Sequence, residues 1–329
     1  MSDPTYRAVV CEALGPPERL SLRAMPRVPL PSGTVRLAVK AAGVNFLDVL
    51  MIQGLYQHKP DLPFVPGLEA SGVVIEIADD VRGVAIGTKV IAQMRTGAYA
   101  QEAIVPAAQL RPMPDELSFE EAATLLVAHI TAYHGLKTRA ALKPDQTLLV
   151  LGAAGGVGLA AVQIGRLLGA RVLAAASTPE KQQAALSVGA HEAIDYREQP
   201  IDAAVKRITS GAGVDVVLDP VGIPSEAALR CLAWGGKLLI AGFAGGTIPS
   251  YAANRILLKG GSVIGVRAGE AGRHDPALRK SELHDVLDFA ARGLAKPHVS
   301  QVLPLSDYAK ALHTLGNRHA IGRIALVMA

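Results

Sequence analysis

The segment Leu148-Leu-Val-Leu-Gly-Ala-Ala-Gly-Gly-Val-Gly158 constrains the fold of this chain more than any other. Four apolar residues precede a glycine-rich turn, in which Ala153-x-Gly155-x-x-Gly158 stands in place of the more common G-x-G-x-x-G. Glycines at such a turn let the backbone approach a pyrophosphate, and the free N–H groups at the start of the following helix favour its charge. The pattern predicts a dinucleotide-binding strand, turn and helix, with tight packing alone as the alternative. The turn residues expected to contact the dinucleotide are Ala154, Gly155, Gly156 and Val157.

The sequence after residue 117 alternates between strand and helix patterns. Ser118-Phe-Glu-Glu121 is a capping box ahead of an apolar stretch, which predicts a long helix over 118–136 and a domain boundary at its start. The predicted strands are 147–151, 171–176, 192–196, 214–219, 237–243 and 262–266, and the predicted helices are 156–168, 179–187, 201–209, 225–232, 278–292 and 306–315. Such alternation requires a parallel, doubly wound sheet and an α/β fold.

The first 117 residues contain short strand patterns separated by Gly and Pro, with little helical periodicity. Alternation is clearest over 34–44, and further strands are predicted at 7–11, 72–78, 89–94 and 98–105, with a final strand at 323–328. The stretch 45–56 interrupts them as a short helix that ends at Gly54. Many short strands indicate a barrel-like β domain.

Composition excludes several classes of protein. The chain has 329 residues, of which 50% are hydrophobic and 19% charged, so it is long enough for two folded domains and too apolar for disorder. Lys and Arg exceed Asp and Glu by four (33 minus 29), and the basic residues are dispersed, which argues against nucleic-acid binding.

Compartment and metal content are also constrained by sequence. There is no run of 18 apolar residues and no apolar secretory core at the amino terminus, so we expect a soluble cytoplasmic protein with no membrane partner. The two cysteines, Cys11 and Cys231, are too few for a disulfide framework or a structural zinc site.

Several motifs spread over nearly the whole chain resemble one family. They are Ala42-Gly-Val-Asn-Phe-Leu-Asp48, Gly54-Leu-Tyr56, Leu62-Pro-Phe-Val-Pro-Gly67, Thr131-Ala-Tyr133, Ala153-Ala-Gly-Gly-Val-Gly158, Asp219-Pro-Val-Gly222 and Gly322-Arg-Ile-Ala-Leu326. Together they are similar to the zinc-independent, zeta-crystallin-like quinone oxidoreductases of the medium-chain dehydrogenase/reductase superfamily. The resemblance implies a GroES-like β-rich catalytic domain at 1–122 and 268–329, a Rossmann NADP-binding domain at 123–267, and a homodimer formed through the strand 262–266.

The end of the second predicted Rossmann strand points to NADPH as the cofactor. An NAD-preferring site places an acidic residue there, whereas this chain reads Ala174-Ala-Ala-Ser-Thr-Pro-Glu-Lys181. Without a carboxylate to repel a 2′-phosphate, Ser177 and Lys181 are available as donors to it. Ser177-x-x-Glu180 is also a capping box, so capping alone is the alternative role of Ser177.

The resemblance also implies roles for individual residues. It places Asn45 and Tyr56 at the substrate pocket and Thr131 near the carboxamide of the cofactor. On the remainder of the cofactor it places Tyr196, Gly242, Phe243 and Arg318, with Tyr196 at the adenosine and Arg318 at the phosphates. Each has a structural alternative: Asn45 and Thr131 as caps or packing residues, Tyr56 as a core aromatic, and Arg318 as a solvated charge. Asp48 is interpreted as structural.

Zinc catalysis is implausible for this chain. Zinc-dependent relatives use Cys, His and Cys ligands, and the matching positions here are Asn45, Leu68 and Val127. These side chains cannot replace that set, and Glu69 alone does not make a site. No metal is therefore expected.

These observations predict an NADPH-dependent reductase that transfers hydride to a quinone or another conjugated carbonyl, such as an enone. Two departures weaken the case for quinone: Gln53 stands where many relatives carry arginine, and the segment 265–270 lacks the aromatic residue found in many relatives. The alternative reaction is reduction of a 2-alkenal or an enoyl thioester such as an acyl-CoA. A cofactor-regulated nucleic-acid-binding or structural protein is the alternative from another class, disfavoured by the dispersed charge and an aromatic content of 4%.

Overall fold

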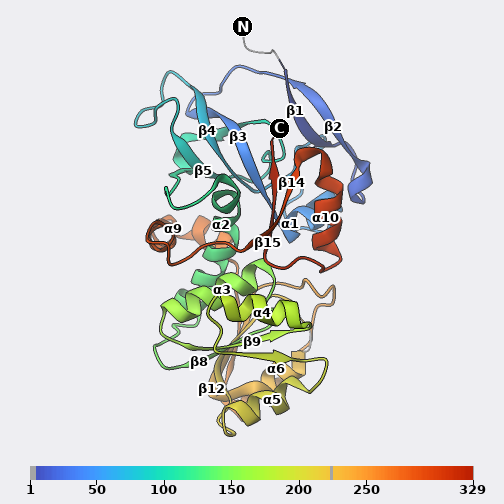
Figure 1. Cartoon of the computed structure of the whole chain (residues 1–329), viewed down its shortest axis with the longest axis vertical. Coiled ribbons are helices and arrows are strands. Elements are labelled where there is room, and N and C mark those ends of the chain that lie inside the picture. The colour runs from blue at the N-terminus through green and yellow to red at the C-terminus, as the bar shows by residue number, and fades with distance from the viewer. Residues whose placement is uncertain (1–4, 223–224, 329) are drawn as a thin grey trace. The chain divides into compact units, whose positions relative to one another are not determined.

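The computed structural model describes residues 5–222 and 225–328, which form two compact units (Figure 1). The first unit comprises Met1–Val127 and Lys296–Ala329, and the second comprises Ala128–Ala295. Residues 268–295 thus belong to the second unit, whereas the sequence had assigned them to the catalytic domain. Their helix α9 (Pro276–Ala291) hydrogen-bonds within the second unit, where Tyr133 donates to Asp285 and His134 contacts Glu282. These bonds explain why the segment stays with that unit.

The first unit is built on a seven-stranded sheet with the path β14-β15-β3-β4-β5-β7, in which β6 also pairs with β3. Its strands are β3 (Thr34–Val44), β4 (Glu69–Ile77), β5 (Lys89–Gln93), β6 (Glu102–Pro106), β7 (Leu110–Pro112), β14 (Val299–Pro304) and β15 (Arg323–Val327). A separate antiparallel pair joins β1 (Thr5–Cys11) to β2 (Leu20–Pro26), and the helices are α1 (Phe46–Ile52) and α10 (Tyr308–Gly316). Because β15 pairs with the end of β3, the two ends of the chain build one sheet.

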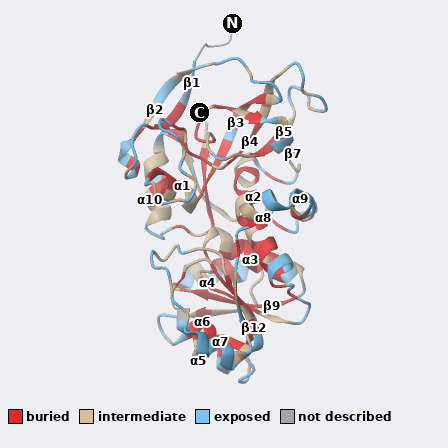
Figure 2. Ribbon diagram, turned by 180° about the vertical axis from the view of Figure 1, so that it is seen from behind, coloured by how far each residue is buried: buried red, intermediate tan, exposed pale blue. Residues whose placement is uncertain are grey.

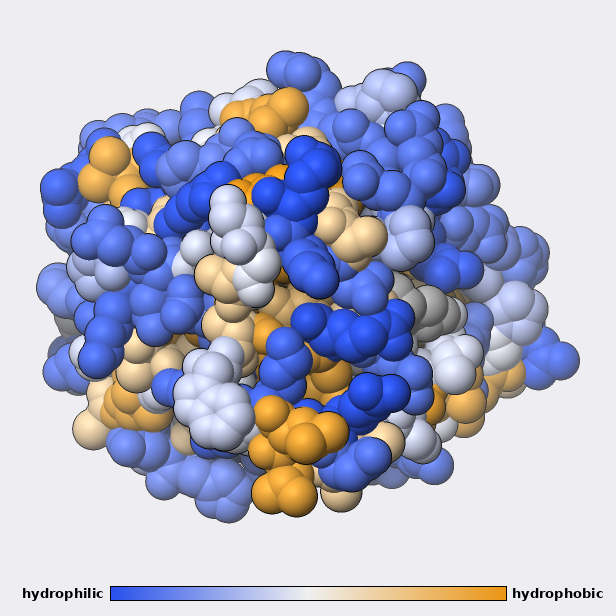
Figure 3. Space-filling view, turned by 90° about the horizontal axis from the view of Figure 1, so that it is seen from below, coloured by the Kyte–Doolittle hydropathy of each residue, from blue (hydrophilic) through white to orange (hydrophobic). Residues whose placement is uncertain are grey.

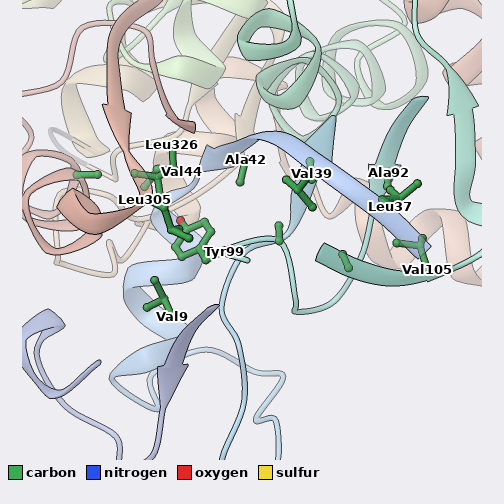
Figure 4. Packing of buried hydrophobic residues seen from close by; sticks show 14 of the residues in the cluster. Val9, Leu37, Val39, Ala42, Val44, Ala92, Tyr99, Val105, Leu305 and Leu326 are labelled. Atoms are coloured by element: carbon green, nitrogen blue, oxygen red, sulfur yellow. The ribbon is translucent and has the colours of Figure 1, made fainter. Parts of the chain in front are cut away.

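The hydrophobic core of the first unit gathers around β3. Val35, Leu37 and Val39 are buried, as their alternation predicts, and Figure 4 shows Leu37 and Val39 among the packed side chains of this cluster. Leu326 of β15 and Leu305 join the same cluster, as does the ring of Tyr99. Burying this apolar surface is what holds the sheet and α1 together.

The second unit contains a six-stranded parallel sheet in the order β10-β9-β8-β11-β12-β13. Its strands are β8 (Thr147–Val150), β9 (Arg171–Ala176), β10 (Glu192–Asp195), β11 (Val214–Asp219), β12 (Leu232–Ile240) and β13 (Ser262–Gly265). Helices α3 (Gly156–Leu167) and α4 (Pro179–Ser187) cover one face, and α5 (Ile201–Ile208) and α6 (Ser225–Cys231) cover the other (Figure 1). Figure 2 shows the buried strands between these helices. This is the doubly wound Rossmann order, which confirms the predicted fold class.

Several elements differ from the sequence expectation. Strands β2, β7 and β14 and helices α7 (Ala253–Lys259) and α8 (Ala268–His274) were not predicted. Helix α7 buries no residue, so it carries no amphipathic signal that a sequence pattern can reveal. The long helix predicted over 118–136 is α2 (Phe119–Tyr133), which continues as a π-helical segment, η3 (His134–Arg139). No helix within 5–222 and 225–328 has both the length and the apolar character needed to cross a membrane.

Candidate active site

The glycine turn of the second unit brings backbone atoms unusually close together. Gly152, after β8, has a φ of 55°, and a Cβ added to it would lie 2.5 Å from Cγ2 of Val221. A Cβ on Gly158 would lie under 3.0 Å from the carbonyl oxygen of Gly152 and from the backbone of Ala153. Side chains are therefore excluded at both positions, and the backbone stays bare where a phosphate would approach.

The helix that follows this turn starts with its N–H groups available. Gly155 is the extended N-cap of α3, and Gly155, Gly156 and Val157 are half-buried, while Ala154 is buried. The first N–H groups of a helix have no intrahelical acceptor, so they form an anion-binding end. The turn is fixed to the sheet because Ala153 N–H donates to the carbonyl of Ala175 at 3.0 Å. The four predicted turn residues thus surround the start of α3.

The adenosine end of the predicted cofactor site lies after β9 and β10. Thr178, rather than Ser177, is the N-cap of α4, because its hydroxyl accepts from the Lys181 N–H at 3.3 Å. The alternative capping role of Ser177 is therefore filled by its neighbour. Tyr196 follows β10 and is 43% exposed, as a stacking residue requires. The neighbouring Asp195 accepts from Arg197 N–H at 2.9 Å and from Gln182 Nε2 at 3.0 Å.

The loops after β11 and β12 follow the carboxyl ends of strands on the other side of β8 from β9 and β10. Asp219, at the end of β11, is fully buried, and its Oδ1 accepts from the N–H groups of Val221 and Gly222, each at 2.8 Å. Burial raises the pKa of its carboxyl, and Oδ2 has no hydrogen-bond partner in the structure. Gly242 and Phe243 follow β12, and Phe243 is 38% exposed beside the Gly222 backbone. The two loops are joined because Ala244 N–H donates to the Pro220 carbonyl at 3.2 Å and Gly245 N–H donates to the Val221 carbonyl at 2.8 Å, where parallel strands end, the usual place for a ligand.

Thr131 lies in α2, within the second unit, and is half-buried. In the first unit, Tyr56 follows α1 after the left-handed turn at Gly54 (φ 72°), and its half-buried ring packs against the core cluster. Arg318 follows α10 with a φ of 61°. The predicted site residues are therefore divided between the units: Asn45, Tyr56 and Arg318 in the first, and the others in the second.

Asn45 is the N-cap of α1, and its contacts are unusually complete. It is 2% exposed, its N–H donates to Asp48 Oδ2 at 2.8 Å, and its Oδ1 accepts from Arg323 Nη2 at 2.9 Å. Its Nδ2 donates to the Gly43 carbonyl and to Glu69 Oε1, each at 3.2 Å. Both amide hydrogens are thus engaged within the protein, so the predicted role of Asn45 as a donor to substrate oxygen finds no free donor in this arrangement.

Glu69 contacts two of the three positions that match zinc ligands in relatives, Asn45 and Val127, and is the chain neighbour of the third, Leu68. It follows Leu68 in the chain, accepts from the side chain of Asn45, and accepts from Val127 N–H at Oε2 at 2.9 Å. Arg323 Nη2 forms an ion pair with the same carboxylate. The guanidinium of Arg323 is thus a cation that contacts this carboxylate.

Burial dominates the electrostatics around Asn45. Desolvation raises the pKa of Asp48 to about 7, against the lowering effect of hydrogen bonds from Asn45 N–H and from Tyr99 Oη at 2.9 Å. Burial also raises the pKa of Glu69, opposed chiefly by Arg323. Tyr99 has a pKa well above its usual range because it is buried next to Asp48. Burial thus favours the neutral form of Asp48, which holds its proton up to near-neutral pH, whereas the ion pair with Arg323 favours the ionised form of Glu69.

Sequence reasoning missed the partners of Asn45. It set Glu69 aside as a single carboxylate and did not single out Tyr99 or Arg323. Arg323 carries a signal that was available, because a charged residue opens an otherwise apolar strand, Arg323–Val327. Tyr99 carries none, since its pairing with Asp48 joins residues 51 positions apart. Within the described part of the chain, no group of three or more His, Cys, Asp or Glu residues is arranged to hold a metal ion.

The two segments expected to line the substrate pocket each expose a polar side chain, Gln53 in the first and Arg267 in the second. Met51 and Ile52 are buried in the core, so Gln53 is the exposed residue where many relatives carry arginine. After β13, Arg267 is exposed and lies 3.6 Å from Glu270 through Nη2 and Oε2. The buried residues before Gln53, Met51 and Ile52, are apolar, so they do not supply the positive charge that arginine gives many relatives at this position.

Comparison with known proteins places these features in one family. Residues 31–115 match the alcohol dehydrogenase GroES-like domain, and residues 156–292 match the zinc-binding dehydrogenase family. The chain is 37% identical to a quinone oxidoreductase-like protein 2 homolog of Nematostella vectensis, over 98% of this chain and 89% of the relative, and 37% identical to quinone oxidoreductase-like protein 2 of Bos taurus, over 98% and 92%. The solved structure of Escherichia coli quinone oxidoreductase complexed with NADPH superimposes with a TM-score of 0.90 at 30% identity, covering 98% of this chain and 99% of that one.

Proposed function

Because this chain belongs to the quinone oxidoreductase-like group of the medium-chain dehydrogenase/reductase superfamily, we propose that it transfers hydride from NADPH to a quinone or a related conjugated carbonyl without zinc. At the coarser level, the chain is an NAD(P)-dependent oxidoreductase with a small-molecule substrate. The observation that carries the proposal is the bare glycine turn, where Gly152 and Gly158 leave no room for a side chain.

The residues of the second unit fit a dinucleotide. A Cβ would fill the turn at Gly152 and Gly158, and the N-terminal end of α3 supplies N–H donors for a pyrophosphate. NADPH is favoured because Ser177 is free of the capping role, Lys181 stands one turn further on, and no carboxylate ends β9 itself. Asp195, at the end of the adjacent β10, is already paired with Arg197 and Gln182. The same preference is supported by the solved relative that contains NADPH.

NADPH, when bound, supplies the hydride. The contribution of this chain is orientation and charge stabilisation: hydride arriving at a conjugated carbon leaves negative charge on the carbonyl oxygen, which a hydrogen-bond donor stabilises. Tyr56 is the proposed donor, because its hydroxyl follows a helix that is fixed at its start and because the amide hydrogens of Asn45 are already used. Protonation of the product then comes from Tyr56 or from water.

Zinc-independence is supported by the side chains at the matching ligand positions. Asn45, Leu68 and Val127 offer one amide and two apolar groups, and Arg323 supplies a cation to Glu69. A metal with an open coordination position needs three protein ligands of suitable chemistry, which this set does not provide. Carbonyl activation is therefore assigned to hydrogen bonding.

The alternative acceptors are 2-alkenals and enoyl thioesters, including acyl-CoA. The observation that favours them is the lack of an arginine at Gln53 and of an aromatic residue within 265–270, both of which would support a quinone ring and its developing charge. A nucleic-acid-binding or structural role is the remaining alternative, and a net charge of +4 spread over the chain gives it little support.

A homodimer through β13 is part of the proposal. This strand forms an edge of the Rossmann sheet, with β12 as its paired neighbour. Large hydrophobic residues are exposed nearby: Trp234 packs beside Gly260, and Leu257 and Leu258 belong to α7, which directly precedes β13. Figure 3 shows hydrophobic side chains gathered on this end of the second unit. Exposed apolar surface next to an open strand edge is typical of an interface between copies.

A cytoplasmic location is proposed as well. Cys11 and Cys231 are both free and buried, one in each unit, which is consistent with a reducing compartment.

The function is tested by titrating the protein with NADPH and with NADH, followed by the fluorescence of the reduced nicotinamide. Trp234 is a poor reporter because it is 81% exposed at the start of β12, whereas ligands of a parallel sheet bind where its strands end. Next, 9,10-phenanthrenequinone, 1,4-benzoquinone and 2-hexenal are added to the complex that forms. Quinone-dependent oxidation of NADPH supports the proposal, turnover of 2-hexenal alone moves it to the alternative, and no binding of either cofactor refutes it.

A further inference from the structure

A buried polar cluster lies where β3 ends and α1 begins, and its members are Asn45, Asp48, Glu69, Tyr99 and Arg323. Each of the five is at most 7% exposed. They come from four parts of the first unit: the start of α1, β4, the loop before β6, and β15. Hydride transfer as proposed above does not use Asp48, Glu69, Tyr99 or Arg323, so the cluster needs a separate explanation.

The cluster permits one orientation of the Asn45 amide. In the observed orientation the oxygen faces Arg323 Nη2 at 2.9 Å, and the nitrogen faces the Glu69 carboxylate at 3.2 Å. Turning the amide by half a revolution would place its N–H groups against a guanidinium, which has no acceptor, and its oxygen against a carboxylate, which has no donor when ionised. The two charged side chains therefore select the orientation.

The same cluster fixes the start of α1. Asp48 Oδ2 accepts from the N–H of Asn45, which holds the first turn, and also from Tyr99 Oη, which ties that turn to a different loop. Gly43 adds a steric restraint, because a Cβ there would lie under 3.0 Å from the carbonyl of Ala123 and from Oε1 of Glu69. The helix that precedes Tyr56 is thus held by both charge and close packing.

Two atoms of the cluster remain without partners in the structure, namely Oδ1 of Asp48 and Nε of Arg323. Buried polar atoms are nearly always hydrogen-bonded in folded proteins, so each exception requires a reason. A cluster optimised for stability would satisfy these atoms or replace the charges with apolar groups. Their presence indicates that the charges are kept for a purpose other than stability.

We propose that Arg323, together with Glu69 and Asp48, is a positioning residue that fixes the Asn45 amide and the first turn of α1, and thereby the wall of the acceptor site that carries Tyr56. The inference rests on the proposed function, because that function places the acceptor beside Asn45 and Tyr56. Arg323 acts through Asn45 and contacts neither acceptor nor cofactor in this proposal.

The test compares Arg323→Met and Arg323→Lys with a matched control, Arg36→Met. Arg36 is a buried arginine of the same unit, 3% exposed, whose Nε donates to Glu76 and whose Nη2 donates to the Val28 carbonyl, each at 2.6 Å, and neither of these partners belongs to α1. We expect Arg323→Met to raise the KM for 9,10-phenanthrenequinone about tenfold, the effect of losing one charge-assisted hydrogen bond. Arg323→Lys keeps the charge and restores part of the effect. The Kd for NADPH should stay within about twofold in all three, because every residue proposed to bind it except Arg318 lies in the second unit.

A second readout separates failure of this inference from failure of the proposed function. Hydrogen–deuterium exchange of peptides spanning 43–53 reports the first turn of α1 directly and needs no acceptor. Faster exchange there in Arg323→Met than in Arg36→Met supports positioning, even if no quinone or enone is reduced by the wild type. Equal exchange and equal changes of KM in the two variants mean a merely structural role and overturn the inference. If Arg323→Met does not fold, Arg323→Lys is measured in the same way against the same criteria.

Discussion

Replacing Asp48 by asparagine is expected to change how the free energy of unfolding depends on pH, with little effect in acid and a clear effect in alkali. Burial raises the pKa of this carboxyl to about 7 in the folded protein, against about 4 in an unfolded chain. The folded state therefore binds the extra proton more tightly. The stability that this provides is fully present below about pH 4 and is lost as pH rises through about 7.

The magnitude follows from linkage. Each pH unit between the two pKa values changes the free energy of unfolding by about 1.4 kcal/mol. Raising the pH from about 5 to the folded pKa of about 7 therefore costs the wild type about 3 kcal/mol through Asp48, and a further rise to about pH 9 adds little. Asparagine keeps the shape and an acceptor for Asn45 N–H, and it cannot ionise. At about pH 5 the variant should lie within about 1 kcal/mol of the wild type, and at about pH 9 it should be the more stable by about 3 kcal/mol.

Calorimetric melting at several pH values measures this difference. For a unit of about 160 residues, 1 kcal/mol corresponds to about 2–4 °C, so the Tm difference should move by about 6–12 °C in favour of the variant over this range. Asp80→Asn is the control: the N–H of Gly33 and the hydroxyl of Ser32 lower the pKa of the exposed Asp80, so the stability that this carboxylate provides is complete above about pH 4 and is lost only as pH falls below it. The Tm difference between this variant and the wild type should therefore stay constant from about pH 5 to about pH 9. A Tm difference for Asp48→Asn that stays flat with pH would refute the reasoning.

Four further predictions concern the cofactor, the acceptor and assembly. Lys181→Ala should weaken NADPH binding about 10- to 100-fold and leave NADH binding unchanged, measured by nicotinamide fluorescence. Gly158→Ala should weaken both cofactors at least about tenfold in the same titration, because a Cβ collides with the Gly152 carbonyl; equal binding would mean the turn does not hold the phosphates. Tyr56→Phe should lower kcat about 100-fold with the Kd for NADPH unchanged, and an unchanged kcat would remove Tyr56 as the donor. Leu257→Glu combined with Leu258→Glu should shift sedimentation from dimer to monomer.

The second unit was largely predictable from sequence because its signals are local. Its central strands are short apolar runs, α4 starts at Thr178 and Pro179, and glycines stand where the backbone must turn sharply. The strands 171–176 and 214–219 and the helix 179–187 therefore match the structure residue for residue. The N-cap of α4 shows what the sequence pattern left undecided. Ser177 and Thr178 are adjacent hydroxyls, and the geometry of the backbone decided that Thr178 caps α4.

The first unit was less predictable because its pairing is non-local. Strand β14 pairs with β15 in parallel, and β15 returns to β3 from nearly 280 residues away, so neither contact leaves a pattern in neighbouring residues. The assignment of 268–295 to the catalytic domain had the same origin, since the hydrogen bonds that tie α9 to residues 133–138 join distant segments.

The sequence by itself determined the doubly wound sheet, the phosphate-binding turn and the lack of the usual zinc ligands, because periodicity, glycine and side-chain chemistry act over a few residues. The tertiary structure decided what surrounds Asn45. Burial is a property of the whole fold, and it turns Asp48, Glu69 and Arg323 from three ordinary charges far apart in the chain into one desolvated cluster whose ionisation and orientation depend on each member.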